Sequence, residues 1–172
     1  MKKLVSILLL TTGLAASAHA AVIIGADAGY LVDAEEEYLS ARLGYAFKAN
    51  ASLVHQLELE VGYSKQEDSG AEGEFIPVTL NYRAETVAAN RLGFYFGAGA
   101  GFAVTDVSFA GFSDDGTSFA LQAFAGVNFK ASDSVSLHLG AKYLWIDDVE
   151  LFGTNVEVGD DVAITAGLSF KF

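Results

Sequence analysis

Histidine and serine are the residues of this chain whose chemistry could be catalytic. Ser136 lies two residues before His138, and a turn centred on residue 133 sets His138 opposite Asn128. An imidazole can act as a general base for a hydroxyl nucleophile when a third group orients it within hydrogen-bond reach. No nucleophile motif surrounds these residues, and an inward-facing histidine on a polar face is more often a structural group. The sequence therefore predicts no catalytic residue.

Cofactor and metal motifs are also missing from the sequence. With no cysteine, the chain has neither a thiolate metal site nor a disulfide framework. The glycine-rich segment 93–102, GFYFGAGAGF, falls inside an expected strand, whereas a phosphate-binding loop joins a strand to a helix. We expect its inward-facing glycines to make room for Tyr95, Phe124 and other long side chains. The sequence predicts neither a cofactor nor a metal site.

Carboxylates are numerous and unevenly distributed. The net charge is −12, which disfavours a nucleic-acid partner because a phosphate backbone needs basic contacts. Of the 22 acidic residues, 17 lie in or beside four segments, 32–36, 66–74, 106–117 and 147–160. Carboxylate oxygens suit hard divalent cations, although no EF-hand spacing is present. A solvated acidic surface is the simpler interpretation, and cation binding that bridges it to an anionic membrane is a sharper hypothesis.

The elements that must position these residues are strands, because apolar residues recur at every second position. A period of two is typical of a strand with two different faces. The pattern covers eight segments, each close to the length of about 9–11 residues that crosses a bilayer at a tilt. These segments are 22–30, 39–47, 56–63, 76–83, 92–104, 119–130, 135–145 and 162–172.

The connections between these segments alternate in length. Residues 48–52, 86–90 and 131–134 form short connections, whereas the acidic segments form the mostly longer ones. Short turns at one end and long loops at the other are typical of a transmembrane barrel. The sequence thus predicts an all-β fold, an eight-stranded antiparallel up-and-down transmembrane β-barrel. Pro77 cannot donate a ladder hydrogen bond, so we expect a bulge or a local opening near the outer rim.

The amino terminus has the layout of a secretory signal peptide. Lys2 and Lys3 precede an apolar run, and Ala18-His19-Ala20 forms a small-residue cleavage pattern. We expect residues 1–20 to be the signal peptide, cleaved after Ala20, and residues 21–172 to be one barrel domain.

Charged residues on the polar face indicate which side of the barrel faces inward. If the turns centre on residues 50 and 88, Arg42 lies opposite Glu58, and Glu85 lies opposite Arg91. Opposed charges and small residues suit a narrow, filled lumen, so the polar face is predicted to point inward. The alternative is a soluble secreted ligand-binding barrel whose apolar face lines the interior. The predicted barrel-interior charge network comprises Arg42, Glu58, Glu60, Arg83 and Lys142.

Aromatic residues support an apolar exterior, because many lie near strand ends, as interfacial girdles do. They are Tyr30, Tyr45, Phe47, Tyr63, Tyr82, Phe102, Phe129, Tyr143, Trp145 and Phe170.

The chain ends TAGLSFKF, with Thr165, Gly167, Phe170 and Phe172 at characteristic spacings. This ending resembles the carboxy-terminal assembly signal of bacterial outer-membrane barrels. The whole mature chain resembles the small outer-membrane β-barrels of the OmpA/OmpX type and the opacity-like proteins. The resemblance implies recognition by the barrel-assembly machinery, escort by periplasmic chaperones, and contact with outer-membrane lipids and lipopolysaccharide.

These observations favour a porin-like outer-membrane protein of a Gram-negative cell, with a structural or surface-recognition role. Its acidic loops would face the exterior and could contact a surface ligand or host target, in an adhesion-like manner. Eight strands leave an interior just wide enough for side chains, so a general diffusion channel is not expected. A lipid-modifying outer-membrane enzyme remains the second alternative, beside the soluble barrel.

Overall fold

The computed structural model describes residues 20–48, 53–68, 71–86, 91–109, 112–151, 154–156 and 159–172. These residues form ten strands, of which eight close a barrel and two form a small separate sheet. The barrel strands are β1 (Ala20–Leu31), β2 (Glu36–Lys48), β3 (Leu53–Asp68), β4 (Ala71–Thr86), β5 (Leu92–Phe109), β6 (Phe112–Lys130), β7 (Val135–Ile146) and β10 (Gly159–Lys171). The separate sheet pairs β8 (Val149–Leu151) with β9 (Thr154–Val156).

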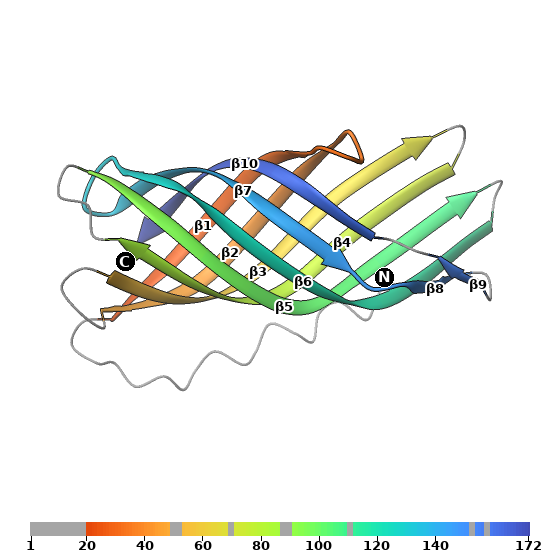
Figure 1. Cartoon of the computed structure of the whole chain (residues 1–172), viewed down its shortest axis with the longest axis horizontal. Coiled ribbons are helices and arrows are strands. Elements are labelled where there is room, and N and C mark those ends of the chain that lie inside the picture. Colours follow the sequence, from red (N-terminus) through yellow and green to blue (C-terminus); the bar gives the residue numbers. More distant parts are fainter. Residues whose placement is uncertain are drawn as a thin grey trace.

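Each barrel strand pairs with its sequence neighbours, and β1 pairs with β10 to close the barrel. All pairings are antiparallel, so the predicted eight-stranded up-and-down topology is confirmed. The carboxy terminus lies at the end of the barrel that also carries the β6–β7 turn (Figure 1). Among the described residues, no helix is long and apolar enough to cross a membrane.

Burial alternates along the strands and shows which face points inward. Phe94, Phe96 and Phe102 on β5 are 60%, 53% and 61% exposed on the outer face. The lumen instead holds buried polar side chains, including Glu58 at 1% exposure and Asn81 at 0%. An apolar exterior of this kind needs lipid around it, because soluble proteins rarely expose large contiguous apolar patches. The alternative of a soluble barrel with an apolar interior is therefore wrong.

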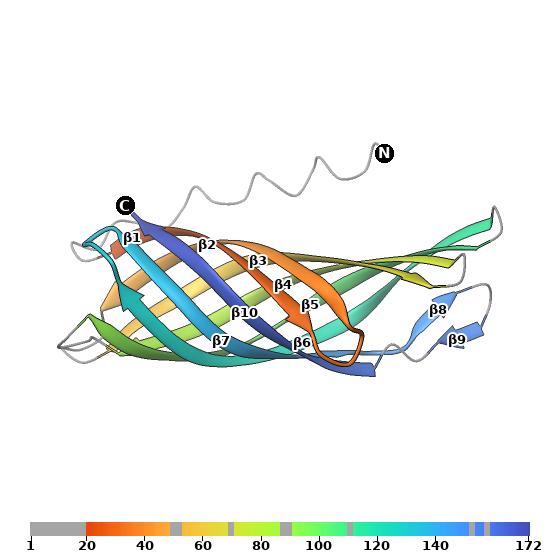
Figure 2. The same ribbon diagram turned by 90° about the horizontal axis from the view of Figure 1, so that it is seen from above.

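Four strands are longer than the sequence pattern predicts. Segments 66–74 and 106–117 were expected to be loops, but β3 and β4 stay paired up to Asp68 and Ala71, and β5 and β6 up to Phe109 and Phe112. The β3–β4 and β5–β6 hairpins consequently project beyond the other barrel strands (Figure 1). We call this four-stranded extension, residues 65–68, 71–74, 105–109 and 112–118, the projecting sheet. The expected loop 147–160 also contains strands, because β8 and β9 form their small sheet near the same end (Figure 2).

The strand registers differ in part from the expected ones. Arg42 is paired with Glu60 rather than Glu58, a slip of two residues that keeps the same face inward. Glu85 is paired with Tyr95, whereas Arg91 precedes β5 with a φ of 65°, so their expected pairing is wrong. The expected pairing of His138 with Asn128 is confirmed.

Pro77 interrupts the β3–β4 ladder without inserting a residue. The pair Val61–Val78 is followed by Ser64–Phe75 in the same register, so the interruption is a local opening and not a bulge. The Pro77 ring is buried in the lumen, where Gly62 leaves room for it and for the Tyr38 hydroxyl.

Candidate functional site

The carboxylate of Glu60 is the centre of a polar cluster inside the barrel. Its Oε1 accepts hydrogen bonds from the Lys142 ammonium group and, at 3.4 Å, from the Tyr38 hydroxyl. Its Oε2 accepts from Asn81 Nδ2 at 2.9 Å and from Gln122 Nε2 at 3.2 Å. These partners come from β2, β4, β6 and β7, so a single carboxylate on β3 links strands on every side of the lumen.

A second carboxylate, Glu58, holds the neighbouring cluster together. Arg83 Nε donates to Glu58 Oε2 at 3.2 Å, and Arg42 Nε lies 4.0 Å from Glu58 Oε1. Arg42 Nη1 also donates to Asp27 Oδ2 at 2.8 Å. The Arg83 guanidinium lies 4.3 Å from the ring centroid of Tyr95, a cation–π contact. Both clusters together set three buried cations against three buried carboxylates, so the buried charge is compensated.

The structure brings all five residues of the predicted interior charge network, Arg42, Glu58, Glu60, Arg83 and Lys142, into the lumen. The sequence reasoning did not include Asp27, Tyr38, Asn81 and Gln122, although each belongs to these clusters. The sequence carried a signal for Asp27, Asn81 and Gln122, which lie at inward positions of the alternating pattern. Tyr38 directly precedes the predicted segment 39–47, so the pattern gave no signal for it. We call the whole set of charged and amide side chains around Glu58 and Glu60 the polar plug.

Glycines leave the space that these long side chains occupy. A Cβ atom on Gly25 would stand 2.5 Å from Arg42 Nε, and a Cβ atom on Gly126 would stand 2.6 Å from the Tyr95 hydroxyl. In the glycine-rich segment, Gly97 and Gly99 face Phe124 and Asn81 in the same way. The expectation that inward glycines make room for long side chains is confirmed.

Below the polar plug, a cavity of about 170 Å³ opens towards the end that carries the carboxy terminus. His138 Nε2 lies 3.0 Å from Ser169 Oγ at its wall, and Glu85 accepts a hydrogen bond from Gln56 Nε2 at 3.1 Å. His138 Nδ1 has no hydrogen-bond partner among the described residues. The Ser–His pair therefore lacks the orienting third group that an activated serine requires. Ser136, which the sequence placed beside His138, also lines this cavity.

Above the polar plug, a cavity of about 410 Å³ occupies the opposite mouth of the barrel. Its wall is apolar where the projecting sheet faces the ends of β1 and β7, and its rim carries carboxylates. Asp161 in this rim has a structural role, because its Oδ1 and Oδ2 accept hydrogen bonds from the Asp33 and Ala34 backbone at 3.0 and 2.9 Å. These bonds hold the turn that joins β1 to β2.

Metal binding receives no support from this rim. Among the residues that the structure describes, no group of three or more His, Asp or Glu side chains could hold a metal ion.

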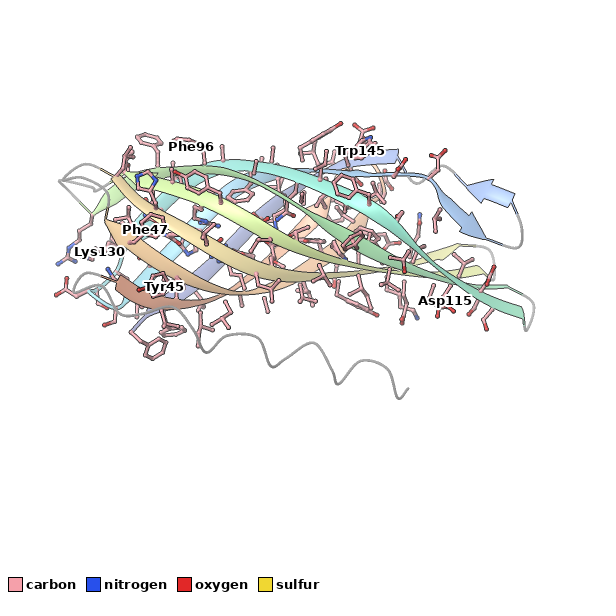
Figure 3. All side chains as sticks on the ribbon, turned by 90° about the horizontal axis from the view of Figure 1, so that it is seen from below. Tyr45, Phe47, Phe96, Asp115, Lys130 and Trp145 are labelled. Carbon is pink, nitrogen blue, oxygen red and sulfur yellow. The ribbon has the colours of Figure 1, made fainter. Side chains whose placement is uncertain are left out.

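Most of the aromatic residues of the expected girdles are exposed on the outer face: Tyr30, Tyr63, Tyr82, Phe102, Phe129, Tyr143 and Phe170. Figure 3 shows Tyr45 and Phe47 near the end that carries Lys130, and Trp145 towards the other end, nearer the middle of the barrel than Asp115. Phe102 and Phe119 form an edge-to-face pair with ring centroids 6.3 Å apart at the base of the projecting sheet. Beyond Val104 the outward residues of β5 become polar, as at Asp106, so the apolar band ends here.

The four residues of the expected assembly signal divide between the two faces of β10. Thr165 is buried in the lumen, and Gly167 leaves room there for the Asp27 carboxylate. Phe170 and Phe172 are exposed on the outside, and the Phe172 backbone N–H donates to the Val22 carbonyl at 2.9 Å. The last residue is thus tied into the seam between β1 and β10.

A comparison with protein families matches residues 6–172 to the outer membrane protein beta-barrel domain. The chain belongs to this family. Membership of this outer-membrane family accounts for the apolar exterior, which needs lipid around it. It also confirms the resemblance inferred from the sequence. A search of the curated proteins finds no match.

Solved structures share the fold of this outer-membrane barrel at low sequence identity. Neisserial surface protein A has a TM-score of 0.65 at 17% identity, over 92% of this chain and 100% of that chain. Ail, the attachment invasion locus protein of Yersinia pestis, has a TM-score of 0.61 at 16% identity, over 90% and 98%. The amino-terminal barrel domain of Pseudomonas aeruginosa OprF has a TM-score of 0.53 at 14% identity, over 88% and 97%.

Proposed function

We propose that this outer-membrane barrel is a surface-recognition protein that contacts basic partners through its projecting sheet. The observation that supports this proposal best is the projection of β3–β6 beyond the other barrel strands, at the end opposite the carboxy terminus (Figure 1). A barrel that only filled the membrane would not need four strands that continue past the aromatic pair Phe102–Phe119. A periplasmic carboxy terminus and short periplasmic turns would place this sheet outside the cell.

The projecting sheet continues past the ladders that join it to the rest of the barrel. The β6–β7 ladder begins at Ala120–Ile146, and the β2–β3 ladder ends at Tyr38–Ser64. Beyond these pairs, β6 contacts β8. The edge of a sheet can present backbone donors and acceptors to another chain, and charged residues keep it from pairing unselectively. Asp115, which is exposed in the projecting sheet, favours partners of opposite charge.

Solved structures of the same fold support a surface role, but the ligand charge that they indicate differs from the one that suits this chain. Ail is named an attachment invasion locus protein, and one of its structures holds the heparin analogue sucrose octasulfate. The acidic residues of this chain's projecting sheet would repel such a polyanion. We infer that the partner here is a basic protein or peptide surface.

Catalysis is the second candidate function, because the His138–Ser169 hydrogen bond resembles part of a nucleophile site. Both side chains face the lumen below the polar plug, where lipid chains do not reach them. We infer that the protein is not an enzyme. Overexpression of wild type should leave the lipopolysaccharide unchanged, as should His138→Ala; a wild-type modification that His138→Ala abolishes would support the enzyme instead.

The recognition proposal is tested on whole cells with shortened hairpins. Replacing residues 107–114 by Asn-Gly retains the Asp106–Asp115 pair, and replacing 67–72 by Asn-Gly retains the Gln66–Gly73 pair. Cells that express wild type should bind more fluorescent poly-lysine than empty-vector cells and no more heparin, and the doubly shortened variant should lose this difference. Equal poly-lysine binding by wild type and variant, at equal barrel content in the outer membrane, would overturn the proposal.

A further inference from the structure

The 410 Å³ cavity at the outer mouth has the size and lining of a small-molecule site. Pockets for small ligands usually measure about 300–1,000 Å³ and combine apolar walls with a few polar groups. Here the apolar part of the wall comes from Leu31, Phe75, Val107, Leu144, Ile146 and Val149. These residues belong to β1, β4, β5, β7 and β8, so the cavity exists only in the closed barrel.

The floor of this cavity is closed. Leu31 and Leu144 belong to one buried apolar cluster, with Tyr38 and Ala163, and Ile146 packs in another, with Ala103 and Ala120. The Tyr38 hydroxyl donates to Glu60, the centre of the polar plug, directly beneath the first cluster. A molecule that enters from outside therefore stops at an apolar floor.

The rim of the cavity is acidic. Asp33, Glu36, Glu74, Asp160 and Asp161 line it, and none of the described lining residues is a lysine or an arginine. Asp161 is engaged with the β1–β2 turn, and Glu74 accepts a hydrogen bond from Tyr63 at 3.3 Å. Asp160 accepts a hydrogen bond from the exposed Tyr143 hydroxyl. Asp33, which is exposed, and Glu36, which is half-buried, are therefore the rim carboxylates that can meet a ligand at the mouth.

We propose that the outer cavity binds small amphiphilic organic cations, with the apolar group on the floor and the ammonium group among the rim carboxylates. Charge complementarity selects the cation, because an anionic or zwitterionic head would meet several carboxylates and no lysine or arginine among the described lining residues. The apolar floor selects an aromatic or aliphatic body over a bare inorganic ion. The buried Thr105 hydroxyl oxygen, which has no hydrogen-bond partner among the described residues, offers one further polar contact in the wall.

This inference goes beyond the proposed recognition function, since a cavity can hold a small molecule whether or not the projecting sheet has a partner. It is tested on the purified full-length mature chain, refolded in nanodiscs of zwitterionic lipid, with empty nanodiscs subtracted. Calorimetric titration compares three probes that share an indole ring: tryptamine as the cation, tryptophol as the neutral analogue and indole-3-propionate as the anion. Tryptamine should bind saturably, tryptophol at least about tenfold more weakly, and indole-3-propionate not measurably.

Point variants with intact hairpins assign the binding to the outer cavity. Asp33→Asn with Glu36→Gln should weaken tryptamine binding about five- to tenfold, because two nearby charges are lost. Asp133→Asn with Asp147→Asn removes the same charge from exposed positions outside the cavity lining and should leave the affinity unchanged. Val107→Asn makes the wall polar at similar volume and should weaken binding several-fold.

The outcomes of this titration separate the alternatives. Tryptamine binding that is lost at the rim and wall positions but retained in the matched control supports the proposal. No saturable tryptamine binding by the folded wild-type barrel would overturn it. Equal affinity for tryptamine and indole-3-propionate, or equal loss in the rim and control variants, would overturn it as well. None of these results depends on poly-lysine binding by cells.

Discussion

The ammonium group of Lys142 on β7 forms an ion pair with the carboxylate of Glu60 on β3, a strand on the opposite side of the closed barrel. Both side chains are almost completely buried, at 7% and 3% exposure. A pair that crosses the lumen ties together strands that share no ladder hydrogen bonds. The polar plug therefore acts as an internal brace, and it fills the lumen that a diffusion channel would need.

Removing one member of this pair should destabilise the barrel. Lys142→Met keeps the side-chain length but leaves Glu60 as an uncompensated buried charge, so we expect a loss of about 3 kcal/mol in the free energy of unfolding. Urea unfolding of the protein refolded in lipid vesicles measures this loss. Glu60→Gln added to Lys142→Met should restore part of it. The matched control is Lys130→Met, which breaks the exposed pair with Asp133 and should change stability by less than about 1 kcal/mol.

The space that Gly25 leaves beside Arg42 should contribute to the stability of the barrel, as the charge of Arg42 does. Gly25→Ala would place a methyl group against the guanidinium that holds Asp27 and Glu58, and overpacking of this kind costs about 1–3 kcal/mol. The same unfolding experiment should show a smaller effect of Gly25→Ala when Arg42 is already Met. Gly73→Ala is the control, because a Cβ atom there would meet nothing within 4 Å. Equal losses at Gly25 and Gly73 would show that the effect comes from the backbone alone.

The outward face of β5 should tolerate charge only above the apolar band. Ala98 lies midway along that band, between Leu92 and Val104, and Asp106 lies on the same face of the strand in the projecting sheet. Ala98→Arg should lower the free energy of unfolding by about 2–4 kcal/mol, because the charge enters the hydrocarbon core. Asp106→Arg should leave it nearly unchanged. Similar stabilities for the two variants in lipid vesicles would contradict the placement of the membrane.

The expected assembly signal can be separated from the stability of the last strand. Phe172→Ser keeps the backbone hydrogen bond to Val22 and removes only an exposed ring, so refolding of the purified chain should be almost unaffected. In cells, the same variant should lower the amount of protein in the outer membrane several-fold if the ring is recognised during assembly. Gly167→Ala, which would displace the Asp27 carboxylate, should impair refolding in both settings. Normal outer-membrane levels of Phe172→Ser would contradict the proposal that the Phe172 ring is recognised during assembly.

The alternating pattern was sufficient to predict the eight barrel strands and the inward face of each. A period of two fixes the face of every residue once one side is assigned, which is why Arg42, Glu58 and Lys142 were placed in the lumen. The pattern does not fix register, because a slip by two residues keeps the same faces. Arg42 was therefore paired with Glu58 when its ladder partner is Glu60.

The upper ends of β3–β6 were not predictable in the same way. The alternation of apolar with polar residues exists only where one face meets lipid, and it disappears once both faces meet water, as at Asp106 and Asp115. Acidic and glycine-rich segments then resemble loops although their backbones stay paired. The outer cavity was missed for the same reason, since its wall combines residues of the projecting sheet, such as Phe75 and Val107, with the ends of distant strands.

The most direct test of this account is the labelling of single cysteines in intact cells with a bulky maleimide-polyethylene glycol. The native chain contains no cysteine, so Asp115→Cys at the tip of the projecting sheet and Asp133→Cys in the β6–β7 turn each report one position. We predict that Asp115→Cys is labelled on intact cells and that Asp133→Cys is labelled only after the outer membrane is permeabilised. Labelling of Asp133→Cys on intact cells, with Asp115→Cys protected, would contradict the orientation on which the recognition function and the outer cavity depend.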